Sequence, residues 1–132
     1  MRPARREFLT GVSLAAAYAW AIESIGDTKA ACMRLLVVCD ERCSDSRAFA
    51  HRASLNGARV VAWRNDAGLL WHERLLPDAS LGVPLAGLTT YADAFVLSRL
   101  AWTCGLRMTK LACNAEALVA WRMERLKQSS VD

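Results

Sequence analysis

The chain has little glycine, little proline and no long uninterrupted hydrophobic run, and each shortage excludes a class of protein. Seven glycines and three prolines among 132 residues exclude collagen-like and low-complexity chains. No apolar run reaches the roughly 18 residues that a membrane-spanning helix needs, so we expect no permanent membrane span. The hydrophobic content of 54% is too high for a disordered chain. This length and composition predict one folded domain.

The sequence also lacks the short motifs of common nucleotide-binding and hydrolytic sites. The segment from Cys39 to Asn56 contains no glycine, so the Gly-x-Gly-x-x-Gly dinucleotide fingerprint is absent there. Neither a Gly-x4-Gly-Lys phosphate loop nor a Gly-x-Ser-x-Gly nucleophile turn occurs. The two histidines, His51 and His72, are both predicted on helix surfaces, which leaves few options for a Ser-His-Asp arrangement. We therefore expect no cofactor, and no enzymatic role is indicated.

The five cysteines do not form a recognisable metal site. Their odd number leaves at least one free or bonded between chains. Cys39 lies in an apolar run, which is typical of a small core residue. The pair Cys39 and Cys43, taken with either histidine, matches no strong zinc spacing. No metal site is predicted.

The N-terminus carries a motif with a specific resemblance. Arg5-Arg6-Glu7-Phe8-Leu9 resembles the twin-arginine (Tat) export signal, in which two arginines and one further residue precede Phe-Leu. An Ala-rich stretch over residues 8–22 follows, and its length suits the apolar region of a signal that is cleaved after Ala19 or Ala21. The resemblance implies that residues 1–30 are a signal peptide and short linker, recognised by the Tat translocase through Arg5, Arg6, Phe8 and Leu9. It also implies a periplasmic or secreted bacterial protein; the alternative is a cytoplasmic protein that keeps this segment as its first helix.

The net charge of +4 overstates how basic the rest of the chain is. Three arginines and one glutamate within residues 1–7 hold half of it. The remaining basic residues are scattered, whereas a nucleic-acid-binding domain carries them in a patch or stripe. We expect no nucleic-acid partner.

Residues 31–132 are predicted to form a single α/β domain in which strands and helices alternate. Strands are expected at residues 34–39, 58–63, 83–88 and 106–113, the last of them a half-exposed edge strand. Helices are expected at residues 44–55, 66–77, 90–105 and 114–127. Right-handed crossovers then give a small three-layer domain with a mostly parallel four-stranded sheet, in the Rossmann-like or flavodoxin-like order 2-1-3-4.

Polar residues cluster where this sheet is expected to bind a ligand. Ligands of open α/β sheets lie beyond the carboxyl ends of the strands, here between the first and third strands. The candidate site residues are Asp40, Arg42, Ser44, Arg64, Thr89 and Thr90. The helix N-termini after Ser44 and Thr90 favour an anion, and an arginine can add a bidentate partner for carboxylate or phosphate. The competing interpretation is that these side chains only cap helices, as Thr90 and Asp93 do in a capping box.

Two functional hypotheses follow. The first is an exported accessory or interaction subunit with a protein partner or a homo-oligomeric state. Its support is the export signal, the missing catalytic motifs and the four tryptophans after residue 30, of which Trp102 or Trp121 is expected to remain partly exposed. The second is a periplasmic module that binds a small anion, or a small enzyme, at the crevice between the first and third strands.

Overall fold

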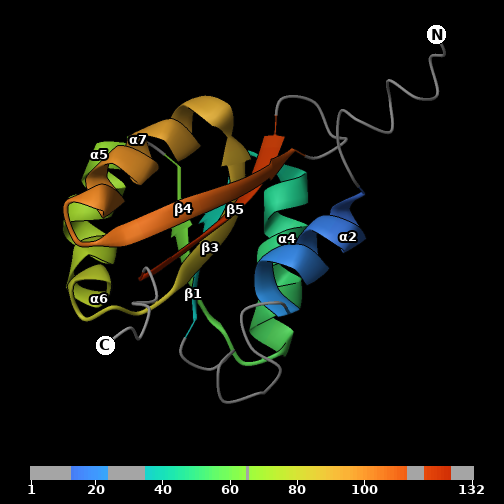
Figure 1. The fold of residues 1–132 in the computed structure, drawn as a ribbon. Coiled ribbons are helices and arrows are strands. Elements are labelled where there is room, and N and C mark those ends of the chain that lie inside the picture. Colours follow the sequence, from blue (N-terminus) through green and yellow to red (C-terminus); the bar gives the residue numbers. More distant parts are fainter. Residues whose placement is uncertain (1–12, 24–34, 65, 113–117, 126–132) are drawn as a thin grey trace, which may run out of the picture.

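The computed structural model describes residues 13–23, 35–64, 66–112 and 118–125. A five-stranded sheet runs through its centre in the order β2-β1-β3-β5-β4 (Figure 1). Its strands are β1 (Leu36–Asp40), β2 (Arg59–Trp63), β3 (Leu85–Thr90), β4 (Leu106–Ala112) and β5 (Leu118–Arg125). β1 pairs in parallel with β2 and β3, whereas β5 pairs antiparallel with β3 and β4.

The expected four-stranded, mostly parallel sheet in the order 2-1-3-4 is wrong in strand number and in pairing. Residues 118–125, which fall within the final helix expected at residues 114–127, instead form β5, which inserts between β3 and β4. Successive side chains from Leu118 to Trp121 enter opposite cores, so the first half of the strand is apolar on both sides and shows no strand alternation. The mixed α/β class and the edge position of β4 are confirmed.

Helices cover both faces of the sheet. On one face lie α2 (Leu14–Tyr18), the π-helical turn η1 (Ala19–Glu23) and α4 (Ser44–Leu55). On the other lie α5 (Ala67–Leu70), the π-helical turn η2 (Trp71–Leu75), α6 (Leu76–Ser80) and α7 (Tyr91–Trp102). The helical run after Asp66 was expected to end at Pro77, but α6 continues to Ser80. Pro77 is the second residue of α6, directly after the π-helical turn, and the helical run continues past it.

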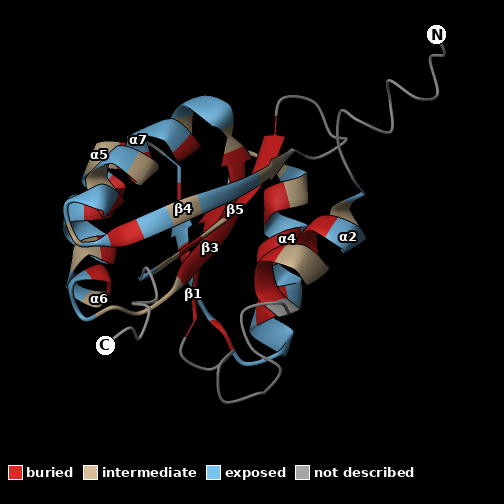
Figure 2. Cartoon of the chain, in the orientation of Figure 1, coloured by how far each residue is buried: buried red, intermediate tan, exposed pale blue. Residues whose placement is uncertain are grey.

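The sheet separates two hydrophobic cores. Leu36 and Val38 of β1 face the core beneath α5, α6 and α7, and Val37 faces the core beneath α4. This alternation is the ordinary geometry of a strand that is buried on both faces. Figure 2 shows the consequence: β1 and β3 are buried along their lengths, whereas β4 is largely exposed.

Local signals set the ends of the main helices. Thr90 caps α7 as expected, because its Oγ1 accepts a hydrogen bond from the Asp93 N–H at 3.2 Å. The Asp93 carboxylate accepts from the same hydroxyl at 3.1 Å, which is not the second hydrogen bond of a capping box. Asp66 caps α5 by accepting from the Gly68 N–H at 2.7 Å. The helix α4 ends at Leu55, and Gly57 follows with a φ of 99°, which a residue with a Cβ rarely adopts.

The segment that was expected to be a signal contributes to the second core. Ala17, Tyr18, Ala21 and Ile22 are buried against α4 and the sheet. The Tyr18 ring meets Phe49 edge to face at 5.5 Å between ring centroids. The motif residues Arg5, Arg6, Phe8 and Leu9 lie outside the described residues. Within the described part of the chain, no helix is both long and apolar enough to cross a membrane.

Candidate functional site

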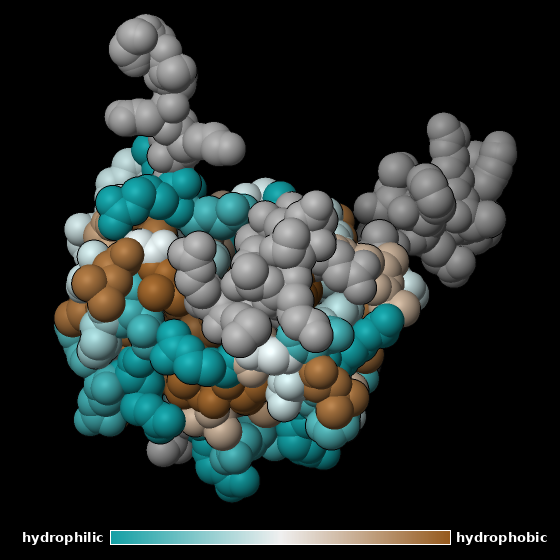
Figure 3. Space-filling model, turned by 90° about the horizontal axis from the view of Figure 1, so that it is seen from below, coloured by the Kyte–Doolittle hydropathy of each residue, from teal (hydrophilic) through white to brown (hydrophobic). Residues whose placement is uncertain are grey.

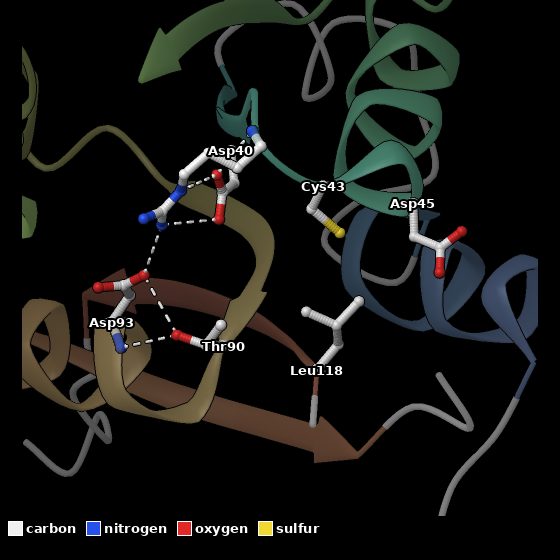
Figure 4. Close-up of a pocket in the computed structure, with 7 residues that line it drawn as sticks. Asp40, Cys43, Asp45, Thr90, Asp93 and Leu118 are labelled. Carbon is white, nitrogen blue, oxygen red and sulfur yellow. Dashed lines mark hydrogen bonds and ion pairs between the residues drawn. The ribbon is translucent and has the colours of Figure 1, made fainter. Parts of the chain in front are cut away.

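A pocket of about 660 Å³ opens at the carboxyl ends of β1 and β3. Figure 4 shows that Asp40 reaches it from β1, Cys43 and Asp45 from the start of α4, and Thr90 and Asp93 from the start of α7. Arg42 and Leu118 complete the lining. The pocket lies where strand order reverses in the parallel half of the sheet, which is the place the sequence predicts.

Arg42 closes over a buried carboxylate in this pocket. Asp40 is only 2% exposed, and its Oδ1 accepts hydrogen bonds from the Arg42 backbone N–H and from Arg42 Nε, both at 3.0 Å. Its Oδ2 accepts from Arg42 Nη2 at 3.1 Å, so the pair is bidentate. The hydrogen bond to Asp40 raises the pKa of Arg42, which keeps the guanidinium charged. Each carboxylate oxygen of Asp40 therefore already has a partner.

The same guanidinium joins three strand ends. Arg42 Nη2 lies 3.3 Å from Oδ2 of Asp93 at the start of α7. That oxygen also accepts from Thr90 Oγ1 at 3.1 Å. The guanidinium carbon lies 5.4 Å from the ring centroid of Trp63, the last residue of β2. Arg42 thus links the ends of β1, β2 and β3 in one polar network.

Three of the six candidate residues come together in this pocket, and three do not. Asp40, Arg42 and Thr90 line it. Ser44 is exposed on the first turn of α4 and is not among the lining residues. Arg64 pairs with Glu41 at 3.4 Å beside a separate, smaller pocket. Thr89 is fully buried, and its Oγ1 accepts from Trp121 Nε1 at 3.0 Å.

Sequence reasoning did not assign Cys43, Asp45, Asp93 and Leu118 to this pocket. The place of Asp93 could have been predicted from the sequence, because a carboxylate in the first turn of a helix that follows a strand lies at the strand-end edge of the sheet. Cys43 is the N-cap residue of α4 without a side-chain cap, a place expected for Ser44, Asp45 or Ser46. Ser46 Oγ instead accepts from the Asp40 N–H at 2.9 Å.

The charges of the pocket limit its chemistry. Its described lining holds three aspartates and one arginine, and that arginine is engaged by two of them. Burial, reinforced by the carboxylates of Glu41 and Asp40, raises the pKa of the neighbouring Cys39 thiol, so Cys39 is a poor nucleophile. No group of three or more His, Cys, Asp or Glu in the described ranges is arranged to hold a metal ion.

A second concave surface runs between α7 and the edge strand β4, with a volume of about 730 Å³, and we call it the α7–β4 groove. Half of the large hydrophobic side chains that are exposed in the described structure lie on α7. Tyr91, Phe95 and Trp102 recur at helical spacing on the face of α7 that does not enter the core. On the face drawn in Figure 3, by contrast, hydrophobic residues lie in separate patches among hydrophilic ones. The groove is lined by, among others, Phe95, Arg99, Trp102, Arg107, Met108 and Lys110.

The four tryptophans after residue 30 divide between core and surface. Trp63, Trp71 and Trp121 are buried, whereas Trp102 is 60% exposed at the groove. The Arg107 guanidinium lies over the Trp102 ring at 4.0 Å from the centroid. The expectation that Trp102 or Trp121 is partly exposed is therefore confirmed for Trp102.

The fold and these two concave surfaces define a small α/β domain with a mixed sheet, a pocket at the ends of β1 and β3 and an aromatic, basic groove along its edge. Comparisons with protein-family models, with curated proteins and with solved structures find no match.

Proposed function

We propose that this protein is an accessory or interaction subunit that binds a protein partner through the α7–β4 groove. The observation that carries the proposal is the exposure of Phe95 and Trp102, at 57% and 60%, on one wall of the groove. Large aromatic side chains beside arginines are the composition that marks binding hot spots. Aromatic side chains that stay exposed to water add little to the stability of the fold through burial, so the exposed rings of α7 are better explained by binding.

Photo-cross-linking in cells tests this proposal. A photoreactive phenylalanine analogue replaces Trp102 in one variant and Leu55 in another. Leu55 is a matched control, because it is 73% exposed at the end of α4 on the opposite face of the sheet. We expect a discrete cross-linked species from position 102 and none from position 55. Equal patterns at both positions, or no product at either, would count against the interaction function.

Export of this subunit is part of the same proposal. The resemblance of Arg5, Arg6, Phe8 and Leu9 to a Tat signal supports a periplasmic or secreted location. Fractionation of the same cells locates the protein. The paired change Arg5→Lys and Arg6→Lys should remove it from the periplasm, and export that survives the change would count against the signal.

A second candidate function is small-molecule binding at the strand-end pocket. Its volume of about 660 Å³ lies within the usual range for ligand pockets, about 300–1,000 Å³. Because Arg42 is already paired with Asp40 and Asp93, and Asp45 adds another carboxylate, these charges favour a ligand with a cationic group over an anion. The second candidate ranks below the first because the polar groups of Asp40 and Thr90 already bond to protein neighbours.

A further inference from the structure

The chemistry of the α7–β4 groove points to one kind of partner, and the inference rests on the interaction function proposed above. We propose that the groove binds an extended, acidic segment of a partner protein, which adds to the sheet as a strand beside β4. Three features of the groove carry this: a free strand edge, an apolar helical wall and an unbalanced positive charge.

The free edge belongs to β4. Among the described strands it is the last in the order β2-β1-β3-β5-β4, and β5 pairs with one of its sides. No described strand pairs with the other side of this seven-residue strand, so its backbone N–H and C=O groups there can pair with an incoming strand. The opposite edge strand, β2, has five residues, and its Arg59 is held by Asp78 at 3.1 Å. β4 is therefore the longer edge and the one beside the aromatic groove.

The apolar wall is the outer face of α7. Alternate side chains of a strand point to the same face of a sheet, so every second residue of an added strand would turn toward α7. There it would meet Phe95 and Trp102, with Met108 of β4 at the base of the groove. A segment with apolar residues at alternate positions would cover these exposed rings.

The charges of the groove indicate which residues the partner segment would carry between its apolar positions. The described residues that line the groove include Arg99, Arg107 and Lys110 and no carboxylate. Each of the three is exposed, and no ion pair joins any of them to an acidic residue in the described ranges. Aspartate or glutamate between the apolar positions of a partner would complement them.

Two other occupants fit the groove less well. A second copy that paired β4 with β4 would bring two sets of these three cations together at one seam, which is repulsive. A single-stranded nucleic acid stacks its bases on open aromatic faces, but Arg107 already covers one face of the Trp102 ring. A nucleic acid would also leave the strand edge of β4 unused.

Peptide binding measured by fluorescence anisotropy tests the inference on the full-length protein. The probe is a labelled eight-residue peptide that alternates valine with glutamate. Control peptides replace each glutamate with lysine, or carry N-methyl groups on the backbone edge that would face β4. We expect binding of the acidic peptide that weakens as salt is added, and at least about tenfold weaker binding of either control.

Variants locate the binding surface. Trp102→Ala and the pair Arg107→Gln and Lys110→Gln should each weaken binding by about tenfold, whereas Leu55→Ala should leave it unchanged. Amide exchange should slow along residues 106–112 when the acidic peptide binds. Equal binding of the lysine peptide, unchanged binding after N-methylation, preference for an oligothymidine probe, or a dimer abolished by Trp102→Ala would each overturn the inference. A cross-link at position 102 without acidic-peptide binding would overturn it and leave the interaction function standing.

Discussion

At the scale of single residues, Arg42 holds the strand-end pocket together. It neutralises the buried carboxylate of Asp40, reaches Asp93 at the start of α7 and stacks on Trp63. Since a buried carboxylate without a partner is costly, the structural value of Arg42 lies mainly in what it does for Asp40. Half of the Arg42 side chain stays exposed, which keeps the guanidinium hydrated at the pocket mouth.

Arg42→Gln should therefore destabilise the protein more than the loss of an ordinary surface arginine. The Arg42 backbone N–H still reaches Asp40, so we expect the free energy of unfolding to fall by about 1–3 kcal/mol. The matched control is Arg64→Gln, which breaks an exposed pair with Glu41 and should cost at most about 0.5 kcal/mol. Urea titration of both variants gives the comparison, and equal losses would show that Asp40 does not depend on Arg42.

At the scale of elements, β5 is the least predictable part of the fold. Leu118 and Ala120 enter one core, and Val119, Trp121 and Met123 enter the other, so the first half of the segment has no polar face. Such a run is compatible with a buried helix or a central strand, and residues with good helix propensity favoured the helix. Pairing with both β3 and β4 decided the outcome, and Gly87 of β3 makes room for Trp121.

Gly87→Ala tests this packing between β3 and β5. A Cβ at position 87 would lie 2.7 Å from Cζ2 of Trp121, so we expect a loss of about 1–3 kcal/mol in the free energy of unfolding. The three closest atoms belong to the six-membered ring of the indole, which Trp121→Phe removes. A double-mutant cycle should then show a coupling of at least about 0.5 kcal/mol that relieves the clash. Strictly additive effects would contradict the proposed contact.

At the scale of the whole molecule, residues 13–23 close the second core. Tyr18 packs on Phe49, its hydroxyl accepts from Asn56 Nδ2 at 2.9 Å, and Arg52 lies over its ring at 4.6 Å from the centroid. Cleavage after Ala19 or Ala21, as the export proposal expects, would remove Tyr18 from this core. Cleavage of the proposed signal would therefore remove residues that the folded chain buries in its second core.

A chain that begins at Ile22 should be less stable than the full chain, because Ala17, Tyr18 and Ala21 leave the core with the removed segment. Tyr18→Ala in the full chain should move stability in the same direction, by about 3 kcal/mol. Leu55→Ala, at an exposed position, should change it by less than about 0.5 kcal/mol. Thermal unfolding of the four proteins measures this. Equal melting temperatures for the full and shortened chains would show that the fold does not need residues 13–21.

The strand-end pocket shows which parts of the candidate site could be predicted from the sequence and which could not. It located the edge of the sheet correctly, because polar residues that follow buried strands must lie there. It could not separate Thr90, which lines the pocket, from Thr89, which lies beneath Trp121, because adjacent residues of a strand point to opposite faces and only the sheet sets which face is open. It placed Arg64 in the same crevice, whereas the observed side chain turns to Glu41.

The sequence by itself determined the α/β class, the strands β1 to β4, the helices α4 and α7, the Thr90 cap of α7 and the edge position of β4. These features depend on local signals, namely apolar runs, turn glycines and capping side chains, which act over a few residues. Only the tertiary structure decided that residues 118–125 form a central antiparallel strand, that residues 13–23 join a core and that Phe95 and Trp102 line an open groove. Each of these depends on contacts between residues far apart in the chain, which alone determine which apolar side chains are covered and which remain in water.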